Sequence, residues 1–310
     1  MIGTISLPDA QALRETDLDP SLDPWAEIER LKRQKNAIIL AHYYQDGEIQ
    51  DLADFVDDSL DLSRRAAATD ADMIVFSLEK TCLPDDFARC RAAHPDHIAL
   101  TYINCSAEVK ALSGIIVTSS NAEYIIIRLP EHQPILFAPD KHLGAYLARK
   151  TGREMVLWDG TCIVHDRFSV RELVKLKTHH PDALIAAHPE CHQGILDHAD
   201  HVGSTRSILD FVLAAPEREF IIATERHIIH QMEKAAPEKT FIAAPGSDGS
   251  CNCADCPFME LNTLEKMYLA IVNGAPRIEI SEDLRLRALK PLEKMLEMSP
   301  PARSVPQAAE

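Results

Sequence analysis

Three cysteines lie close together late in the chain, in the segment Cys251-Asn-Cys-Ala-Asp-Cys256. Grouped thiolates are typical ligands of zinc or of iron–sulfur clusters, and neighbouring thiols can also form a redox pair. The same pattern is compatible with a few buried thiols that have no special function. A metal site is favoured because Cys162 and Cys82 stand at comparable points of an internal repeat described below.

Side chains suited to acid–base chemistry follow two of the apolar runs. His188 and Glu190 come directly after the run that begins at Leu184, and His42 and Tyr44 have the same spacing after another run. Residues two apart on a strand point to the same face, so each pair could contact one substrate. Either histidine could equally be a hydrogen-bonded residue at the end of a strand.

Hydroxyl side chains precede several expected helices. Ser119, Ser120, Ser204 and Thr205 stand where free backbone N–H groups bind phosphate or carboxylate. The same residue types are equally typical of plain helix caps. Taken together with the residues above, they indicate a site for an anionic small molecule.

The elements that must position these side chains form a threefold repeat. Short apolar runs alternate with helical segments such as 170–176 and 207–214, which predicts parallel sheets covered on both faces. A chance similarity among βα units is the alternative. The corresponding runs are 38–45, 98–105 and 184–191, then 54–59, 115–120 and 200–205, then 73–77, 135–141 and 220–225, and finally 155–162 and 241–245.

We therefore expect three similar α/β domains, each with three αβα layers and a parallel sheet, facing a common axis. The first domain is truncated, because residues 77–98 have room for a turn and one helix (85–93) but not for a fourth strand and its crossover. The expected domains span residues 24–96, completed by C-terminal helices over 262–298, then 97–181 and 182–261, with flexible ends at 1–23 and 299–310.

The polar clusters all follow the carboxyl ends of the expected strands, where open α/β sheets bind ligands. Three thiolates from three domains would ligate a [4Fe–4S] cluster at three irons and leave the fourth iron open. An open iron is a Lewis acid that can bind a substrate oxygen and help a hydroxyl group to leave. The candidate ligands are Cys162, Cys256 and Cys82, whereas Cys251 and Cys253 could bind zinc or form a redox pair with Cys256.

Composition excludes several classes of function. The 310-residue chain is 46% hydrophobic and carries a net charge of −16, which argues against nucleic acid or an anionic membrane as a partner. No apolar run is long enough for a membrane span, and the acidic N-terminal segment does not resemble a secretory signal. We expect a cytoplasmic protein with reduced cysteines.

The chain resembles the quinolinate synthase family, the iron–sulfur enzymes of NAD biosynthesis, from about residue 35 to 297. The matching stretches are Ala41-His-Tyr-Tyr-Gln45, Asp51-Leu-Ala-Asp-Phe-Val56, Tyr102-Ile-Asn-Cys-Ser-Ala-Glu108, Thr118-Ser-Ser-Asn-Ala122, Pro139-Asp-Lys141, His188-Pro-Glu-Cys191, Val202-Gly-Ser-Thr205 and Cys256-Pro-Phe-Met with Asn262-Thr-Leu-Glu265. The resemblance implies three α/β domains about a pseudo-threefold axis around a [4Fe–4S] cluster. It also implies a transferase that condenses iminoaspartate with dihydroxyacetone phosphate to quinolinate, with loss of phosphate and water.

The resemblance assigns roles to residues of this chain. Glu190 and Tyr44 are the expected proton-transfer groups, with His188 beside them in the catalytic set. An L-aspartate oxidase is the expected supplier of iminoaspartate. The expected substrate-binding residues are His42, Ser59, Tyr102, Asn104, Ser119, His188, Glu190 and Thr205, and the expected cluster ligands are Cys82, Cys162 and Cys256.

Two departures from the family pattern leave an alternative open. The first domain is shortened at Ser77–Pro84, so Cys82 is either the displaced first cluster ligand or a different cysteine. Asp57 stands where the family usually has glycine, and a carboxylate beside Ser59 is unfavourable for an anionic substrate. The alternative is a degenerate, non-catalytic member without a stable cluster, or a zinc-binding protein.

Overall fold

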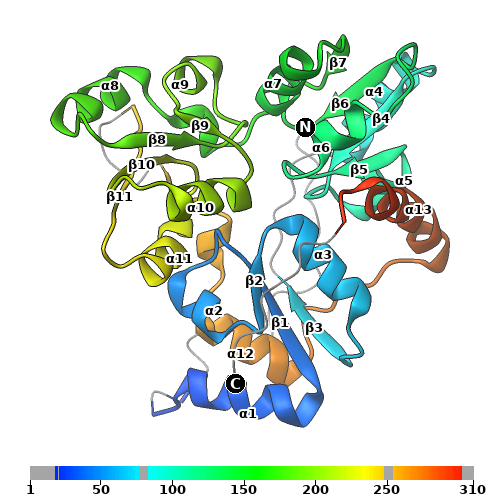
Figure 1. Ribbon diagram of the computed structural model, residues 1–310. Coiled ribbons are helices and arrows are strands. Elements are labelled where there is room, and N and C mark those ends of the chain that lie inside the picture. The colour runs from blue at the N-terminus through cyan, green and yellow to red at the C-terminus, as the bar shows by residue number, and fades with distance from the viewer. Residues whose placement is uncertain (1–17, 20, 77–82, 248–253, 302–310) are drawn as a thin grey trace.

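Three parallel sheets, each with its own helices, make up the protein (Figure 1). The computed structural model describes residues 18–19, 21–76, 83–247 and 254–301. The predictions for Cys82, Cys251 and Cys253 therefore concern residues outside the described ranges. The elements below are those that bring the candidate residues together.

The first sheet has the strand order β2-β1-β3. Its strands are β1 (Ala37–His42), β2 (Phe55–Asp57) and β3 (Met73–Phe76), and its helices are α1 (Pro24–Lys35), α2 (Gly47–Leu52) and α3 (Ser59–Ala68). Helix α1 begins where the sequence predicts, because the Asp23 carboxylate accepts hydrogen bonds from the Trp25 and Ala26 N–H groups and Pro24 fits the first turn. Its buried Ile28 packs with Ile39 of β1.

The second sheet has the order β5-β4-β6-β7. Its strands are β4 (Ile98–Tyr102), β5 (Ile115–Val117), β6 (Ile135–Ala138) and β7 (Met155–Leu157), and its helices are α4 (Pro84–Ala93), α5 (Ala107–Ala111), α6 (Ala122–Ile126) and α7 (Lys141–Thr151). Strands β5 and β6 are buried at every position. Their continuous apolar runs are typical of parallel strands covered on both faces.

The third sheet has the order β9-β8-β10-β11. Its strands are β8 (Leu184–Ala187), β9 (His201–Val202), β10 (Glu219–Ala223) and β11 (Thr240–Ala243), and its helices are α8 (Val170–His179), α9 (Gln193–Leu196), α10 (Thr205–Ala214) and α11 (Ile228–Ala235). The one-turn helix η3 (His165–Arg167) precedes α8 in the chain, and the one-turn helix η5 (Met259–Leu261) follows β11.

The strand order repeats from sheet to sheet. In each sheet the first strand of the unit pairs with the second on one side and the third on the other, and all pairs are parallel. The α/β class and the expected strands are therefore confirmed. Within the described residues the first sheet contains three strands and the other two contain four. The exact symmetry and the domain limits stay predictions.

Two C-terminal helices follow the third sheet. Helix α12 (Leu264–Asn273) packs on α1, and Lys35 Nζ donates to the Ile271 carbonyl at 2.6 Å. Helix α13 (Glu282–Met298) lies against α5 and β5 of the second sheet instead (Figure 1). Among the described helices, none has the length and apolar character needed to cross a membrane.

Candidate active site

A pocket lies where the carboxyl ends of strands from all three sheets meet. Parallel α/β sheets bind ligands at these ends because loops there are free to carry polar side chains. Most of the residues singled out from the sequence line it: His42, Tyr44, Ser59, Tyr102, Asn104, Cys162, His188, Glu190, Thr205 and Cys256. The pocket is also lined by residues that were not predicted as site residues: Phe76, Pro139, Asp140, Thr161, Val164, His165, Glu225 and Met259.

Ser119 lies at the edge of this pocket. Its hydroxyl accepts a hydrogen bond from Tyr102 at 3.4 Å, and its side chain lines a neighbouring pocket. Ser120 donates to the Asp58 carboxylate, and Ser204 accepts from the Ser207 N–H as the cap of α10. Ser120 and Ser204 therefore have structural partners, whereas Ser119 and Thr205 remain close to the pocket.

Glu190 is buried at the centre of the polar side chains. Its Oε2 lies 3.0 Å from His165 Nδ1 and 3.8 Å from His188 Nδ1. Burial alone would raise the pKa of Glu190, but His188 and His165 outweigh burial and hold it well below its ordinary value. Glu190 is therefore an ionised carboxylate that can accept a proton or a hydrogen bond.

The two histidines predicted at strand ends are neutral at neutral pH. Burial lowers the pKa of His188 to about 3 and that of His42 to about 4, and Glu190 opposes both shifts without overcoming them. Among the residues that the structure describes, none is a hydrogen-bond partner of His188 Nε2. A neutral imidazole with an unused ring nitrogen can bind a substrate that brings the missing donor or acceptor.

Tyr44 and Tyr102 bring two phenols into the pocket. The Tyr44 hydroxyl lies 2.7 Å from Thr224 Oγ1 and accepts a hydrogen bond from Thr205 at 3.1 Å. Burial raises the pKa of Tyr44, and it raises the pKa of Tyr102 well above its ordinary value together with Glu190. Both phenols therefore keep their protons and can act as donors.

His165, three residues after Cys162, was missed from the sequence. Its Nε2 lies 2.9 Å from Thr224 Oγ1, while its Nδ1 faces Glu190. Burial lowers the pKa of His165, but Cys162 and Glu190 outweigh burial and raise it well above its ordinary value. The signal that could have found it is the Cys-x-x-His spacing, which places both side chains on one short turn.

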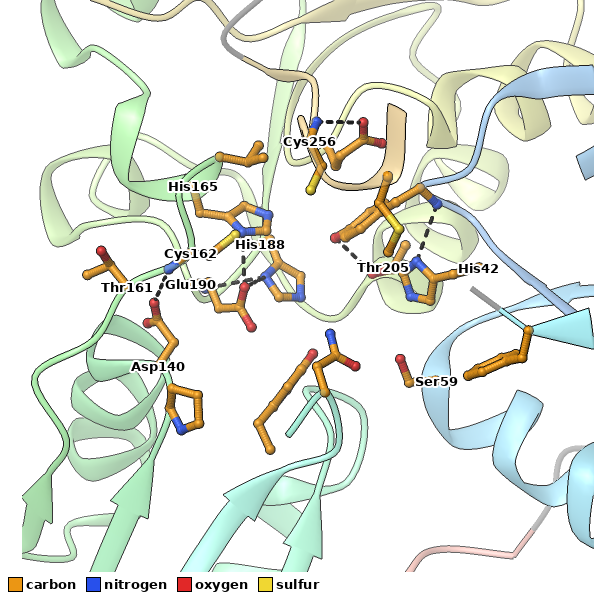
Figure 2. Close-up of a pocket in the computed structure, with 18 residues that line it drawn as sticks. His42, Ser59, Asp140, Thr161, Cys162, His165, His188, Glu190, Thr205 and Cys256 are labelled. Atoms are coloured by element: carbon orange, nitrogen blue, oxygen red, sulfur yellow. Dashed lines mark hydrogen bonds and ion pairs between the residues drawn. The ribbon is translucent and has the colours of Figure 1, made fainter. Parts of the chain in front are cut away.

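The two described candidate ligands, Cys162 and Cys256, open onto the same pocket (Figure 2). The Cys162 N–H donates to Asp140 Oδ2 at 2.7 Å, and the Cys256 N–H donates to Glu225 Oε1 at 3.3 Å. Each loop that carries a cysteine is thus held by a buried carboxylate. Both thiols border the same pocket, and thiols are the kind of ligand that iron–sulfur clusters use.

A second arrangement of metal ligands shares Cys162. Ligand atoms of Cys162, His165 and Glu190 all lie within 4.8 Å of one another. Figure 2 shows these three side chains together on one side of the pocket, with His42 and Ser59 on the other. A cysteine, a histidine and a carboxylate are also a suitable set for a single zinc ion.

Fold and site together define a class of protein. Parallel sheets whose strand ends share one pocket of thiols, imidazoles, carboxylates and phenols are typical of an α/β enzyme acting on a small polar molecule. The chain belongs to the quinolinate synthetase A protein family, whose model matches residues 26–78 and 77–297. This confirms the resemblance found in the sequence motifs.

Curated relatives agree with the family match. Quinolinate synthase from Microcystis aeruginosa is 52% identical over 305 residues, covering 89% of this chain and 95% of the relative. Quinolinate synthase from Synechococcus is 52% identical over 312 residues, covering 92% and 97%. Quinolinate synthase from Chloroherpeton thalassium is 49% identical over 306 residues, covering 90% and 95%.

Proposed function

We propose that this chain is a quinolinate synthase, which condenses iminoaspartate with dihydroxyacetone phosphate to quinolinate with loss of phosphate and water. The observation that carries the proposal is the convergence of Tyr44, Glu190, Cys162 and Cys256 on one pocket in a member of this family. The reaction belongs to de novo NAD biosynthesis. We place the enzyme in the cytoplasm, with an L-aspartate oxidase as supplier of iminoaspartate.

The side chains of the pocket fit the proton transfers of this reaction. Glu190 is ionised and accepts a proton, while Tyr44 is neutral and donates one. His42 and His188 hold substrate through neutral ring nitrogens, since both pKa values are low. Tyr102 and Asn104 complete the wall on the side of the second sheet.

Hydroxyl groups fit the anionic parts of the substrates. Ser59 begins α3, Thr205 begins α10, and Ser119 lies beside Tyr102. Helices α3 and α10 each direct the positive end of their dipole toward this region, which favours a carboxylate or phosphate. These hydroxyls offset the unfavourable overall charge of −16 near an anionic ligand.

We propose Cys162 and Cys256 as two ligands of a [4Fe–4S] cluster, with Cys82 as the third. A cluster held by three thiolates supplies a Lewis acid, which helps a hydroxyl group to leave. The chain from Phe76 to Cys82 is six residues long and spans at most about 20 Å, so Cys82 can reach the pocket that Phe76 lines. The pseudo-threefold arrangement and the truncation of the first domain are part of the same proposal.

Two observations support the truncation. The family match consists of two segments that meet at residues 77 and 78. Within the described residues, the first sheet also has one strand fewer than the others. We therefore propose that the shortened region lies between residues 77 and 84, the part of the sequence that contains Cys82.

Anaerobic purification and reconstitution test the function. The loaded protein should contain iron and sulfide and form quinolinate from the two substrates, and a colourless, iron-free protein would remove the proposal. The ligand assignment is tested by Cys82→Ala, with Cys90→Ala as the control because Cys90 lies on α4 and packs with Phe87. If Cys82→Ala keeps its iron and activity, Cys82 is not a ligand.

One observation favours a second candidate function. The close grouping of Cys162, His165 and Glu190 suits a single zinc ion in a non-catalytic family member. Metal analysis separates the two candidates, because this alternative expects about one zinc per chain and no quinolinate. It also expects zinc binding to be lost in His165→Ala and kept in Cys82→Ala.

A further inference from the structure

The same backbone turn follows the first strand of each sheet, namely β1, β4 and β8. In each turn an N–H group donates to the carbonyl three residues earlier, a hydrogen bond typical of a β-turn. These bonds run from Gln45 to His42 at 3.0 Å, from Cys105 to Tyr102 at 3.3 Å and from Cys191 to His188 at 2.9 Å. The third residue of each turn lines the pocket, and these residues are Tyr44, Asn104 and Glu190.

A short helix follows each turn, and its fourth residue differs among the three sheets. Helices α2, α5 and α9 begin two residues after the turn, at Gly47, Ala107 and Gln193 (Figure 1). Helical side chains lean toward the N-terminus of their helix, so this fourth residue can reach back to the turn. It is Gln50 in α2, Lys110 in α5 and Leu196 in α9.

Gln50 holds the turn that carries Tyr44. Its Nε2 donates to the carbonyls of Tyr43 at 3.0 Å and Gln45 at 2.7 Å, which stand on either side of Tyr44 in the chain. The same nitrogen lies 3.0 Å from the carbonyl of His227, just before α11 of the third sheet. Three carbonyls therefore share the two N–H protons of one amide, which is only 2% exposed.

Lys110 does the same for the turn that carries Asn104. Its Nζ donates to the carbonyl of Ile103 at 2.6 Å and to the carbonyl of Cys105. These two carbonyls stand on either side of Asn104, as the two carbonyls bound by Gln50 stand on either side of Tyr44. Two different side chains thus supply a donor at the same place in two sheets.

We propose that Gln50 and Lys110 are positioning residues for Tyr44 and Asn104, and that each of the two positions requires a side-chain N–H donor. This inference rests on the proposed function, which makes Tyr44 the proton donor and Asn104 part of the substrate-binding wall. Without a donor the carbonyls of the turn lose their partner, so the turn rearranges or bears the cost of desolvation. A displacement of about 1 Å in a positioned group can slow a reaction about 10²-fold.

The third sheet holds its turn by other contacts. Leu196 is a buried residue of the apolar core there and has no side-chain donor. The Cys191 thiol donates to the Ala223 carbonyl at 3.3 Å, and His192 Nε2 lies 2.9 Å from the Phe168 carbonyl. Position 196 is therefore the natural control for positions 50 and 110.

Substitutions of Gln50 test the need for a donor in the iron-loaded enzyme. Gln50→Met nearly keeps the size of the side chain and removes the donor, so kcat for quinolinate should fall about 10- to 100-fold. Gln50→Lys introduces the donor that the second sheet uses, and kcat should stay within about threefold of wild type. A wild-type kcat in Gln50→Met, or equal losses in Gln50→Met and Gln50→Lys, would overturn the inference.

Substitutions of Lys110 should affect a different kinetic constant. Lys110→Met should raise KM at least about fivefold and change kcat less than about twofold, because it displaces Asn104 and leaves Tyr44 in place. Lys110→Gln keeps a donor and should have a KM within about twofold of wild type. Lys110 is partly exposed, so its variants decide the question if Gln50→Met does not fold. An unchanged KM in Lys110→Met would contradict the inference.

Leu196→Met is the matched control, since it changes the equivalent residue without removing a donor. Leucine and methionine are similar in volume, and both kinetic constants should stay at their wild-type values. Partial unfolding would lower kcat alone in every variant, so the separate effects on kcat and KM distinguish positioning from lost stability. Iron content is measured in each variant so that loss of the cluster is not read as lost positioning.

A spectroscopic readout separates this inference from the proposed function. In protein labelled with ¹³C at the tyrosine Cζ position, the signal absent from Tyr44→Phe reports the surroundings of the Tyr44 hydroxyl without substrate. It should move in Gln50→Met and stay in place in Lys110→Met and Leu196→Met. A signal that moves in this way in a protein that makes no quinolinate supports the positioning and contradicts the proposed function. A signal that moves in all three variants, or in none, contradicts the role of Gln50 whatever the activity.

Discussion

The guanidinium of Arg206 on α10 reaches Asp57 at the end of β2, with Nη1 3.5 Å from Oδ2. The hydroxyl of Tyr43 donates to the same carboxylate at 3.1 Å and accepts from Arg206 at 3.2 Å. Asp57 is the residue that we expected, from the sequence, to depart from the family pattern. The negative charge of Asp57 is paired with Arg206, which lies on a helix of the third sheet. Asp57 is therefore not an uncompensated charge beside Ser59.

The Asp57–Arg206 pair should therefore contribute to the free energy of unfolding by linking the first sheet to a helix of the third. In a double-mutant cycle of Asp57→Asn and Arg206→Gln, we expect a coupling energy of about 0.5–1 kcal/mol, typical of a partly exposed ion pair. Urea denaturation measures the four proteins. The exposed pair Arg285–Glu282 on α13 is the control and should couple less. Strict additivity of the two substitutions would contradict the prediction.

Removal of the Tyr44 hydroxyl should slow the proposed reaction. Tyr44→Phe loses the proton donor, and general acid–base groups typically contribute about 10²- to 10⁴-fold to a rate. We expect kcat for quinolinate to fall in that range at unchanged iron content. The adjacent Tyr43→Phe is the matched control, since Tyr43 contacts Asp57 and does not line the pocket. A Tyr44→Phe enzyme as fast as Tyr43→Phe would rule out this role.

Iron content should depend on two of the described cysteines and not on a third. Cys162→Ala and Cys256→Ala should each lower bound iron at least about tenfold after anaerobic reconstitution, since each removes a proposed ligand. Cys191→Ala should keep its iron. Cys191 is fully buried, its thiol donates to the Ala223 carbonyl, and burial raises its pKa to about 12, so it is not a thiolate ligand. Iron loss in Cys191→Ala alone would reverse the assignment.

Acid should destabilise the metal-free protein through its buried histidines. The folded pKa of His188, about 3, lies below the unfolded value of about 6.5. Between these values only the unfolded chain binds the proton, so stability present above pH 6.5 is lost as the pH falls. The slope for one such group is at most about 1.4 kcal/mol per pH unit.

Urea denaturation of wild type and His188→Asn between pH 7.5 and 5 measures this slope. The variant should lose less stability on acidification, while His198→Asn, at an exposed position, should follow wild type. His42 contributes to the wild-type slope in the same direction, because burial lowers its pKa to about 4. Equal slopes for His188→Asn and wild type would show that His188 takes its proton in the folded state.

Much of the fold could be predicted because strand patterns are local. The apolar runs gave the strands and their repeated order, and Asp23 with Pro24 gave the start of α1. The packing of α13 on the second sheet could not be predicted, since an amphipathic helix does not reveal which surface it covers. Tertiary contacts decide that choice.

For the residues of the site, too, local patterns could be predicted and contacts between distant parts of the chain could not. Residues with a partner two positions away, such as His188 and Glu190, could be recognised in the sequence because strand geometry places them on one face. Thr224 could not be recognised, because its partners Tyr44 and His165 come from distant parts of the chain. His165 has a local signal only in its spacing from Cys162, and its contact with Glu190 could not be read from the sequence. A single threonine after a strand carries no signal of its own until Tyr44 is placed beside it.

The pocket combines Tyr44 from the start of the chain with Cys256 from near its end. During synthesis the sheets can form in order as the chain emerges from the ribosome, since α/β units fold from the N-terminus. The pocket, however, stays incomplete until the last of these residues has been added. Until then Cys162 stands in an unfinished pocket, where its thiol is more accessible to oxidants.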